Sequence, residues 1–339
     1  MANLMLTKQC NLHCSYCFAN EFVNRQSDVM SYENFLKCLD FLASDPQERI
    51  GLIGGEPTMH PELKKMLGRL IESPFQQVCL FTNGILLDQF FTELRNSKFT
   101  ILINLNAPSS IGQANFDRTI HNIDQMVNHL YMRSQVQLSL NVYAPDMDYQ
   151  YMLDVLKRFQ MKRLRLSVAV PNMENGRQVD PLEYFRLMAD TVRRLVRDLL
   201  EIGVAPVFDC NYIPYCIFSD EDGELAARYP EVMKRSNIRR INPICSPVLD
   251  ILPDLQVVRC FGMSSLYKVN LLDFRSTQEL QRHFDAEIDK LAYHILPSSE
   301  CRGCREYAAQ RCSGGCYAYR LEKLRKLRQD IRSVWGELK

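Results

Sequence analysis

Residues 4–17 read LMLTKQCNLHCSYC, and this stretch decides the fold. Residues 4–7 form a short run that is typical of a β-strand. Three cysteines follow it directly, at positions 10, 14 and 17, with the spacing C-x3-C-x2-C. Parallel α/β folds place their ligand sites on the loops at the carboxyl ends of their strands. We therefore predict that these cysteines lie on a functional loop at the end of the first strand.

The chain up to residue 209 alternates β-rich runs with helical patterns, as parallel βαβ units do. The clearest helix begins after Ser31, an N-cap residue, where Phe35, Cys38, Leu39 and Leu42 recur at i, i+3, i+4 and i+7. The predicted strands are 4–7, 51–54, 78–82, 100–106, 136–142 and 163–170, with a possible extra strand at 205–208. The further predicted helices are 61–71, 87–94, 116–130, 149–159 and 182–202.

Composition restricts the class of protein. The 339 residues are 46% hydrophobic, which is ample for a buried core, and the formal net charge is only +1. Charges of both signs are interspersed, so we expect neither a nucleic-acid partner nor another polyanion. No stretch has the length of a membrane span or the pattern of a signal peptide, so the sequence predicts a cytoplasmic protein. Thirteen cysteines in a reducing compartment indicate metal binding rather than disulfides.

The cysteine triad predicts an iron–sulfur site with an open coordination position. Cys10, Cys14 and Cys17 can bind three irons of a 4Fe-4S cluster, and no fourth cysteine is close in sequence. Iron–sulfur sites ordinarily use four cysteines, so three favour chemistry at the free iron. The alternative is a zinc site completed by His13 or by a distant residue.

With the motif at residues 54–57, the triad resembles the radical S-adenosylmethionine superfamily. Tyr16 matches the family position that packs against adenine. Gly54, Gly55, Glu56 and Pro57 match the GGEP motif that binds the methionine amino group. Two glycines allow backbone carbonyls to approach a ligand closely, and a glutamate offers a carboxylate to an ammonium group.

The resemblance extends over the first 209 residues, and it implies a partial (β/α)6 TIM-like barrel with a cysteine-rich C-terminal extension. It also implies further S-adenosylmethionine contacts at strand ends. These are Thr82 and Asn83 in a TNG segment, Asn104 and Asn106 after the fourth strand, and Asn141 and Ser167 on later strands. Each of these residues could instead form a simple turn or cap.

The alternating pattern fails after residue 209, and residues 210–316 carry eight cysteines. The segment CRGCREYAAQRCSGGC at 301–316 resembles the SPASM or twitch extension, which carries auxiliary iron–sulfur clusters. By this resemblance one auxiliary cluster would use Cys245, Cys260 and Cys316, and a second would use Cys301, Cys304 and Cys312.

The extension departs from the family pattern in two respects. Leu255 stands where the family usually has a glycine, and the outermost cysteines of the family are not visible in place. Six ligands cannot fill two clusters of four cysteines. Either Cys210 and Cys216 complete both sites, or one site is open or absent. If they are not ligands, either thiol could donate a hydrogen atom to a substrate radical. Zinc knuckles are the alternative for the whole set.

Two cysteines and the C-terminal segment are predicted to have structural rather than chemical roles. Cys38 on an apolar helix face and Cys79 within a strand are predicted to be small core residues. The basic pattern of residues 317–338 predicts a solvated terminal helix. The predicted organisation is a barrel domain at 1–209, an auxiliary-cluster domain at 210–316 and a terminal helix at 317–339.

The resemblance implies an enzyme that splits S-adenosylmethionine to a 5′-deoxyadenosyl radical. SPASM-type extensions accompany peptide or protein modification, so we expect crosslinking, oxidation or epimerisation of a ribosomally made peptide. The expected partners are a reductant such as flavodoxin or ferredoxin and, because only nine residues precede Cys10, a separate leader-binding protein.

Three alternatives remain open from the sequence. Sulfatase maturation is disfavoured, because those enzymes carry an aspartate directly after the cysteine that matches Cys260, and this chain has Phe261. A small-molecule radical dehydrogenase with one auxiliary cluster is the second alternative. The third belongs to another class, a non-catalytic iron–sulfur or zinc protein, and it predicts no cleavage of S-adenosylmethionine.

Overall fold

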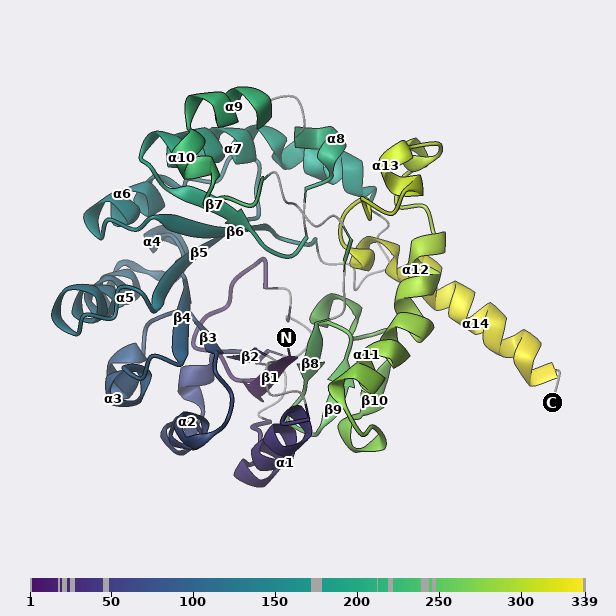
Figure 1. Ribbon diagram of the computed structural model, residues 1–339, viewed down its shortest axis with the longest axis horizontal. Coiled ribbons are helices and arrows are strands. Elements are labelled where there is room, and N and C mark those ends of the chain that lie inside the picture. Colours follow the sequence, from purple (N-terminus) through teal and green to yellow (C-terminus); the bar gives the residue numbers. More distant parts are fainter. Residues whose placement is uncertain are drawn as a thin grey trace.

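The protein forms one curved sheet with helices along its outer side (Figure 1). The computed structural model describes residues 2–337, apart from 18, 20–22, 25–27, 45–48, 172–178, 212, 219–221, 239–243 and 246–247. The ten strands follow the order β10-β9-β8-β1-β2-β3-β4-β5-β6-β7. In Figure 1 the strands curve around a common centre, toward which the loop after β1 extends.

Seven neighbouring strands are parallel, as the alternating pattern predicts. They are β1 (Ala2–Thr7), β2 (Ile50–Gly54), β3 (Val78–Thr82), β4 (Phe99–Asn104), β5 (Val136–Val142), β6 (Arg163–Val168) and β7 (Ala205–Phe208). The possible extra strand at 205–208 is confirmed as β7. The strands predicted at 100–106 and 163–170 each end two residues earlier, so Asn106 lies beyond β4 in a loop.

The predicted helices connect these strands. Ser31 caps α1 through its hydroxyl, which accepts the Asn34 N–H at 3.1 Å, and the predicted face of α1 is buried. The helices of this half are α1 (Tyr32–Leu42), α2 (Leu63–Glu72), α3 (Phe91–Leu94), α4 (Pro108–Ile111), α5 (Gln113–Asp124), α6 (Gln150–Arg158) and α7 (Pro181–Glu201). Short 3-10 turns at Pro57–Met59 and Leu87–Phe90 and a π-turn at Gln125–His129 supplement them.

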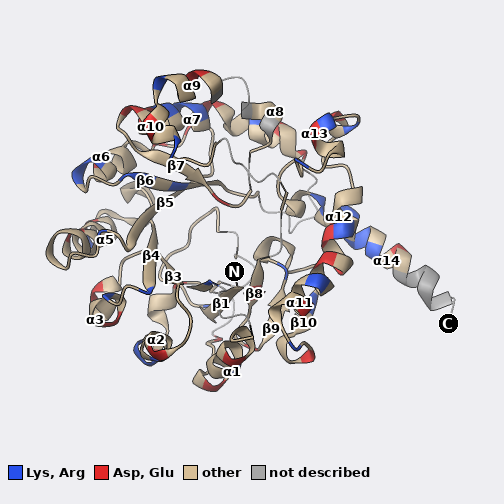
Figure 2. Ribbon diagram, in the orientation of Figure 1, with Lys and Arg blue, Asp and Glu red and all other residues tan. Residues whose placement is uncertain are grey.

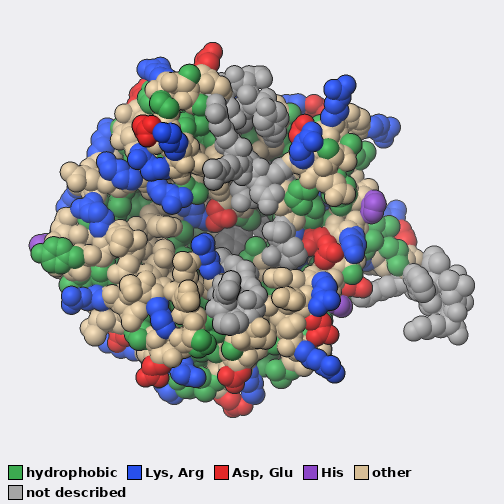
Figure 3. Space-filling view, viewed as in Figure 1, with side chains coloured by type: hydrophobic (Ala, Val, Ile, Leu, Met, Phe, Trp, Pro, Cys, Tyr) green, Lys and Arg blue, Asp and Glu red, His purple; other side chains and the backbone are tan. Residues whose placement is uncertain are grey.

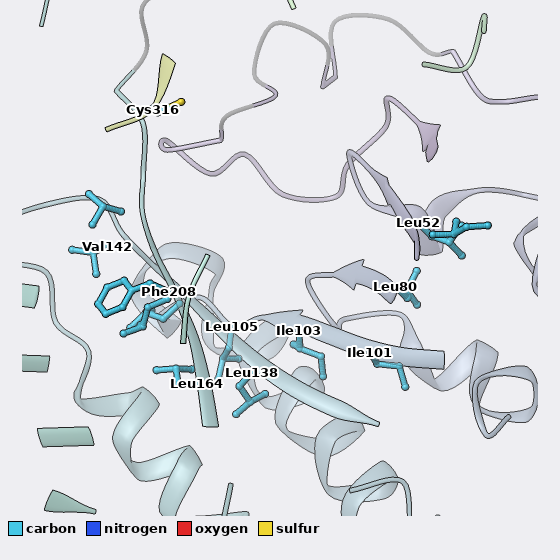
Figure 4. Close-up of a cluster of buried hydrophobic side chains, with 14 of the residues drawn as sticks. Leu52, Leu80, Ile101, Ile103, Leu105, Leu138, Val142, Leu164, Phe208 and Cys316 are labelled. Atoms are coloured by element: carbon cyan, nitrogen blue, oxygen red, sulfur yellow. The ribbon is translucent and has the colours of Figure 1, made fainter. Parts of the chain in front are cut away.

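The hydrophobic core lies between the sheet and the outer helices. Alternate strand residues point toward the helices, because successive side chains of a strand face opposite sides. Figure 4 shows this layer, which includes Leu52, Leu80, Ile101, Leu138 and Leu164 from five neighbouring strands. Cys38 belongs to the same cluster and is fully buried, so its prediction as a core residue is confirmed.

The opposite, inner side of the sheet carries charged and polar side chains near Cys79, and this corrects the prediction for Cys79. Its neighbours in sequence, Val78 and Leu80, face the core, so alternation turns Cys79 inward, where it is only partly buried. It lies near Arg165 and Asp209, which are joined by an ion pair of 2.7 Å. Cys79 therefore borders a polar interior and is not a core residue.

The extension continues the sheet at the free edge of β1. Strand β8 (Leu249–Ile251) pairs parallel to β1, and β9 (Gln256–Val258) and β10 (Lys268–Asn270) follow in antiparallel order. The Asn3 amide donates to Asp250 Oδ1 at 2.7 Å across the β1–β8 junction. These strands were not predicted from the sequence, because each is only three residues long.

Short helices complete the extension. They are α8 (Tyr215–Phe218), α9 (Asp222–Arg228), α10 (Pro230–Met233), α11 (Thr277–Phe284), α12 (Lys290–His294) and α13 (Arg305–Ala308). A π-turn at Asp285–Asp289 joins α11 to α12, and 3-10 turns occupy Phe261–Met263, Leu271–Asp273, Ser299–Cys301 and Tyr317–Arg320.

Leu255 shows how the chain replaces the glycine of the family pattern. It has φ of 66°, in the left-handed region that glycine adopts without cost and a branched side chain adopts at a cost of about 1 kcal/mol. Its side chain is buried in the core. Burial of the leucine side chain therefore offsets the strained backbone, and the tight turn between β8 and β9 is retained.

The terminal helix α14 (Leu321–Glu337) projects from the body in Figure 1, but its first turns are packed. Leu321 and Leu324 are buried, and the buried Arg328 lies 3.0 Å from Glu287. The prediction of a wholly solvated helix is therefore wrong for this part. A stripe of apolar residues at helical spacing overrides the basic composition. Residue 338, where the predicted helix ends, lies outside the described residues.

Charges of both signs alternate over the helices and over the face shown in the space-filling view (Figures 2 and 3). This distribution agrees with the near-neutral composition. Among the described residues, none of the helices has both the length and the apolar character needed to cross a bilayer.

Candidate functional site

The three N-terminal cysteines lie on the loop that follows β1, as predicted. The Cys17 N–H donates to the Cys14 carbonyl at 3.1 Å, which makes the C-x2-C part a tight turn. The Cys10 Sγ accepts the Leu12 N–H at 3.4 Å, and the Asn106 amide lies 3.9 Å from the Cys14 Sγ. The loop therefore presents thiols with hydrogen-bond donors, a common feature of iron–sulfur ligands.

All three thiols are partly buried, and this affects their protonation. Burial, with smaller contributions from the nearby Glu56, Cys14 and Cys17, raises the pKa of Cys10 to about 12. Burial also raises the pKa of Cys14 and of Cys17. These thiols become thiolates at neutral pH only beside a strong positive charge, which is what iron supplies.

Gly54 and Gly55 are required by the chain's own backbone. A Cβ on Gly54 would lie 2.6 Å from the Thr7 carbonyl oxygen, and one on Gly55 would lie 2.2 Å from that of Gln9. The Gly55 and Glu56 N–H groups donate to these two carbonyls at 2.8 and 2.7 Å. The motif thus clamps the segment that leads into Cys10. The freedom of the glycines serves this contact, a use that the sequence interpretation did not foresee.

Glu56 is the centre of a buried hydrogen-bond network. Its Oε1 accepts from the Thr58 hydroxyl at 2.6 Å and from the Thr82 hydroxyl at 2.7 Å, and its Oε2 accepts the Asn83 N–H at 2.7 Å. Burial raises the pKa of Glu56, while these donors oppose the shift. The carboxylate joins the ends of β2 and β3, and Pro57 starts a buried turn directly after it. Asn83 in turn donates to the Asn11 side chain of the cysteine loop at 2.7 Å.

The predicted polar residues of the later strands form a second group. The Ser167 hydroxyl donates to Asn141, whose amide donates to Asn104 at 3.0 Å. Asn104 donates to the Tyr16 hydroxyl at 3.0 Å, and this hydroxyl also donates to Asn106. This row of hydrogen-bonded side chains runs from β6 to the cysteine loop. It includes five predicted residues, which are Tyr16, Asn104, Asn106, Asn141 and Ser167.

The sequence interpretation missed Tyr143, although it lies in this row. Its ring stacks on Tyr16 with a centroid separation of 4.7 Å and an interplanar angle of 16°. The position shortly after a strand end was a signal that could have identified it. Tyr16 is therefore fixed by a stacked ring on one side and by hydrogen bonds at its hydroxyl.

The C-terminal cysteines fall into two sets of four. In the first set the Cys316 thiol donates to Cys245, and Cys316 also interacts electrostatically with Cys210 and Cys260. Cys210 has φ of 51° and Asn211 has φ of 42°, both unusual for residues other than glycine. Such a strained turn directly after β7 aims Cys210 toward the three cysteines that the resemblance had grouped.

The second set combines Cys216 on α8 with three cysteines of the final motif. Cys216 interacts electrostatically with Cys301, Cys304 and Cys312. The sulfur of Cys312 accepts the Gly314 N–H at 3.3 Å. Cys210 and Cys216 thus lie where the first of the two arrangements left open by the sequence requires them.

The CSGGC segment forms a turn that needs its glycines. Gly314 has φ of 64° and Gly315 has φ of 96°, and a Cβ on Gly314 would lie 2.4 Å from Pro297. The turn separates Cys312 from Cys316 and so distributes them between the two sets. The sulfur of Cys316 accepts the Ala318 N–H at 3.4 Å.

The chemistry of the three groups of cysteines fits the ligands of iron–sulfur clusters. In the described part of the chain no three His, Cys, Asp or Glu side chains converge on one point as the ligands of one ion do. Cluster thiolates bind separate iron atoms, and each auxiliary set provides the four cysteines that such a cluster takes. The donor sets therefore fit one site of three cysteines and two sites of four.

Comparison with known proteins identifies the N-terminal part of the chain. The radical SAM superfamily model matches residues 4–135, which include the triad and residues 54–57. Residues 4–135 form a radical SAM domain. The predicted membership of this superfamily is thus confirmed for the part of the chain that carries the motifs.

Sequence similarity to a curated relative covers part of the chain. GTP 3′,8-cyclase of Geobacter sulfurreducens is 35% identical over 98 residues, which are 28% of this chain and 30% of that protein. The match thus covers less than a third of the relative's length.

Solved structures are similar over the whole chain. SuiB of Streptococcus suis bound to S-adenosylmethionine has a TM-score of 0.63 at 16% identity, with 95% of this chain and 73% of that chain covered. The enzyme anSMEcpe with bound AdoMet and the Cp18Cys peptide has a TM-score of 0.64 at 17% identity, with 100% and 99% covered. The predicted α/β fold, a partial TIM-like barrel with a cysteine-rich C-terminal extension, is confirmed.

Proposed function

We propose that this radical SAM protein is an enzyme that cleaves S-adenosylmethionine reductively, with Cys10, Cys14 and Cys17 as the ligands of a 4Fe-4S cluster. The observation that carries the proposal is the cysteine loop at the end of β1, clamped by Gly54 and Gly55. When bound, the cluster and S-adenosylmethionine together supply a carbon-centred radical that removes a hydrogen atom from the substrate.

The protein's own contribution is positioning. Glu56 and the two glycines hold the cysteine loop against β2, and the row from Tyr16 to Ser167 supplies amide and hydroxyl groups at the ends of β4 to β6. We assign this row to the ribose and carboxylate of S-adenosylmethionine and Tyr16 to the adenine side. Fixed polar groups of this kind place a reacting bond without reorganisation at the moment of reaction.

The two sets of four cysteines are assigned to two auxiliary clusters. Cys210, Cys245, Cys260 and Cys316 would hold one, and Cys216, Cys301, Cys304 and Cys312 the other. We propose that residues 1–209 carry the radical chemistry and that 210–316 carry these clusters. Anaerobic reconstitution should then give about twelve irons per chain, whereas a plateau near four would exclude auxiliary clusters.

A peptide or protein substrate is favoured by two observations. Structural neighbours have been solved with peptides, anSMEcpe with Cp18Cys and SuiB with its precursor peptide SuiA. The part of the inner side that β5 and β6 form, with Ser139, Asn141 and Arg165, offers polar side chains that could bind a peptide backbone. Coexpression with a candidate peptide tests this. A loss of two hydrogens indicates crosslinking or oxidation. An unchanged mass in ordinary water, together with deuterium uptake in heavy water, indicates epimerisation. No change of either kind would remove that peptide as a substrate.

A nucleotide substrate is the second candidate, because the sequence relatives include GTP 3′,8-cyclases. GTP-dependent formation of 5′-deoxyadenosine, in the absence of any peptide, would favour it over the peptide proposal. A reductant such as flavodoxin or ferredoxin is required in either case, and a separate leader-binding protein remains part of the peptide proposal.

A further inference from the structure

Arg259 is a buried cation in direct contact with the first auxiliary set. It precedes Cys260 and is 1% exposed. Its Nη1 donates to the Cys245 Sγ at 3.3 Å and to the Cys260 Sγ at 3.7 Å, and its Nη2 donates to the Cys245 carbonyl at 3.0 Å. One guanidinium thus contacts two of the four sulfurs proposed to bind the cluster.

The surroundings of Arg259 hold it in place. Its Nε donates to Asp289 Oδ1 at 2.5 Å, and its guanidinium lies 5.1 Å from the centre of the Tyr317 ring. The Arg320 guanidinium lies 4.9 Å from the centre of the same Tyr317 ring, and it donates to the backbone carbonyls of Ala292 and Ser313. Arg259 contacts the sulfurs, whereas the hydrogen bonds of Arg320 go to carbonyls. The two buried arginines are therefore a matched pair for comparison.

A buried cation beside cluster thiolates has a definite electrostatic effect. Reduction adds a negative charge to a cluster, and a nearby positive charge with N–H donors to its sulfurs stabilises the reduced form. Solvent screens charges weakly at a site that is 1% exposed. Asp289 acts in the opposite direction, because its carboxylate lies on the far side of the same guanidinium.

We propose that Arg259 is a positioning residue that raises the reduction potential of the auxiliary cluster held by Cys210, Cys245, Cys260 and Cys316, and that the negative charge of Asp289 partly offsets this effect. This inference rests on the proposed auxiliary cluster. No role was predicted for Arg259 from the sequence, although a basic residue directly before a ligand cysteine was a signal that could have identified it.

The test is an EPR-monitored redox titration of reconstituted holoenzyme at pH 8.5, where Asp289, whose pKa burial raises to about 7, is ionised. Arg259→Gln combined with Asp289→Asn keeps a hydrogen-bonded pair of similar shape without its charges, and Arg259→Lys keeps the cation. Asp289→Asn alone removes the negative charge that offsets Arg259. Arg320→Gln is the control for loss of a buried arginine that does not donate to these sulfurs.

In the Arg259→Gln/Asp289→Asn protein we expect the equilibrium constant for reduction of this cluster to fall at least tenfold. For a one-electron couple this is a shift of the reduction potential of about 59 mV to a more negative value. The Asp289→Asn protein should shift to more positive potential, and Arg259→Lys and Arg320→Gln should stay closer to wild type. Unchanged potentials in both Asp289 variants, or shifts of the same sign, would overturn the proposal. Wild-type protein that binds only about four irons would instead refute the auxiliary clusters themselves.

Discussion

At the scale of single residues, the GGEP motif is both a structural clamp and a site motif. The sequence identified Gly54, Gly55 and Glu56 from their resemblance to a family, but it could not show that the two glycines contact the backbone of residues 7–9. That contact depends on the pairing of β1 with β2, which is set by the whole sheet. The same residues therefore support the fold and position Cys10.

Gly55→Ala tests this double role. The new Cβ would lie 2.2 Å from the Gln9 carbonyl, so we expect the free energy of unfolding to fall by about 1–3 kcal/mol and the cluster at Cys10 to be lost or depleted. Gly68→Ala in α2 is the control, because nothing lies within 4 Å of its Cβ position. It should stabilise the protein by about 0.5–1 kcal/mol. Urea denaturation and iron analysis measure both effects, and a neutral Gly55→Ala would contradict the clamp.

Glu56→Gln tests the buried network. The amide nitrogen would face either the hydroxyl donors or the Asn83 N–H, so one donor would lose its acceptor. We expect the free energy of unfolding to fall by about 1–3 kcal/mol, the cost of removing hydrogen bonds to a charged group. Glu62→Gln removes a partly exposed carboxylate beside Lys65 and should change stability by less than about 0.5 kcal/mol. Equal effects of the two substitutions in urea denaturation would refute a special role for Glu56.

At the scale of elements, the junction of β1 with β8 joins the extension to the barrel. Asp250 accepts from Asn3 and from the Phe261 N–H at 2.9 Å, and burial raises its pKa to about 7. The sequence predicted the strands of the barrel well, because they are long and alternate with helices. It missed β8 to β10, since three-residue strands have no readable period.

The pKa of Asp250 predicts a pH dependence of stability with a definite sign. The folded protein binds this proton more tightly than the unfolded chain, so the stability that it contributes is lost as the pH rises toward and through about 7. We expect the difference in free energy of unfolding between wild type and Asp250→Asn to shrink by about 1 kcal/mol from pH 6 to pH 8. Chemical denaturation at the two pH values measures it. A difference that grows with pH would show that the ionised form is the favoured one.

At the scale of the whole molecule, segments far apart in sequence form the two auxiliary sets. The motif at 301–316 and the pair Cys245 and Cys260 were recognisable from their resemblance to the SPASM or twitch extension. The assignment of Cys210 and Cys216 was not, because each reaches its set only through the turn after β7 or through α8. Sequence spacing predicts ligands that lie on one loop, but it does not predict ligands that the fold brings together.

Removal of one cysteine from each set should therefore remove one cluster. We expect Cys210→Ala and Cys216→Ala each to lower the iron content of reconstituted protein from about twelve to about eight per chain. Cys38→Ala, in the hydrophobic core, should leave the iron content unchanged. A full iron content in the Cys216→Ala protein would contradict the role of Cys216 as a required ligand and would leave its alternative role as a hydrogen-atom donor open.

We propose that the loop after β1 holds the cluster that initiates the radical reaction. The most direct test of this proposal is the formation of 5′-deoxyadenosine by anaerobically reconstituted protein that is given dithionite and S-adenosylmethionine. The wild-type protein should form it, and a protein with Cys10, Cys14 and Cys17 all replaced by alanine should not. Formation of 5′-deoxyadenosine by the triple variant, or its absence in wild-type protein with a full iron content, would contradict the account.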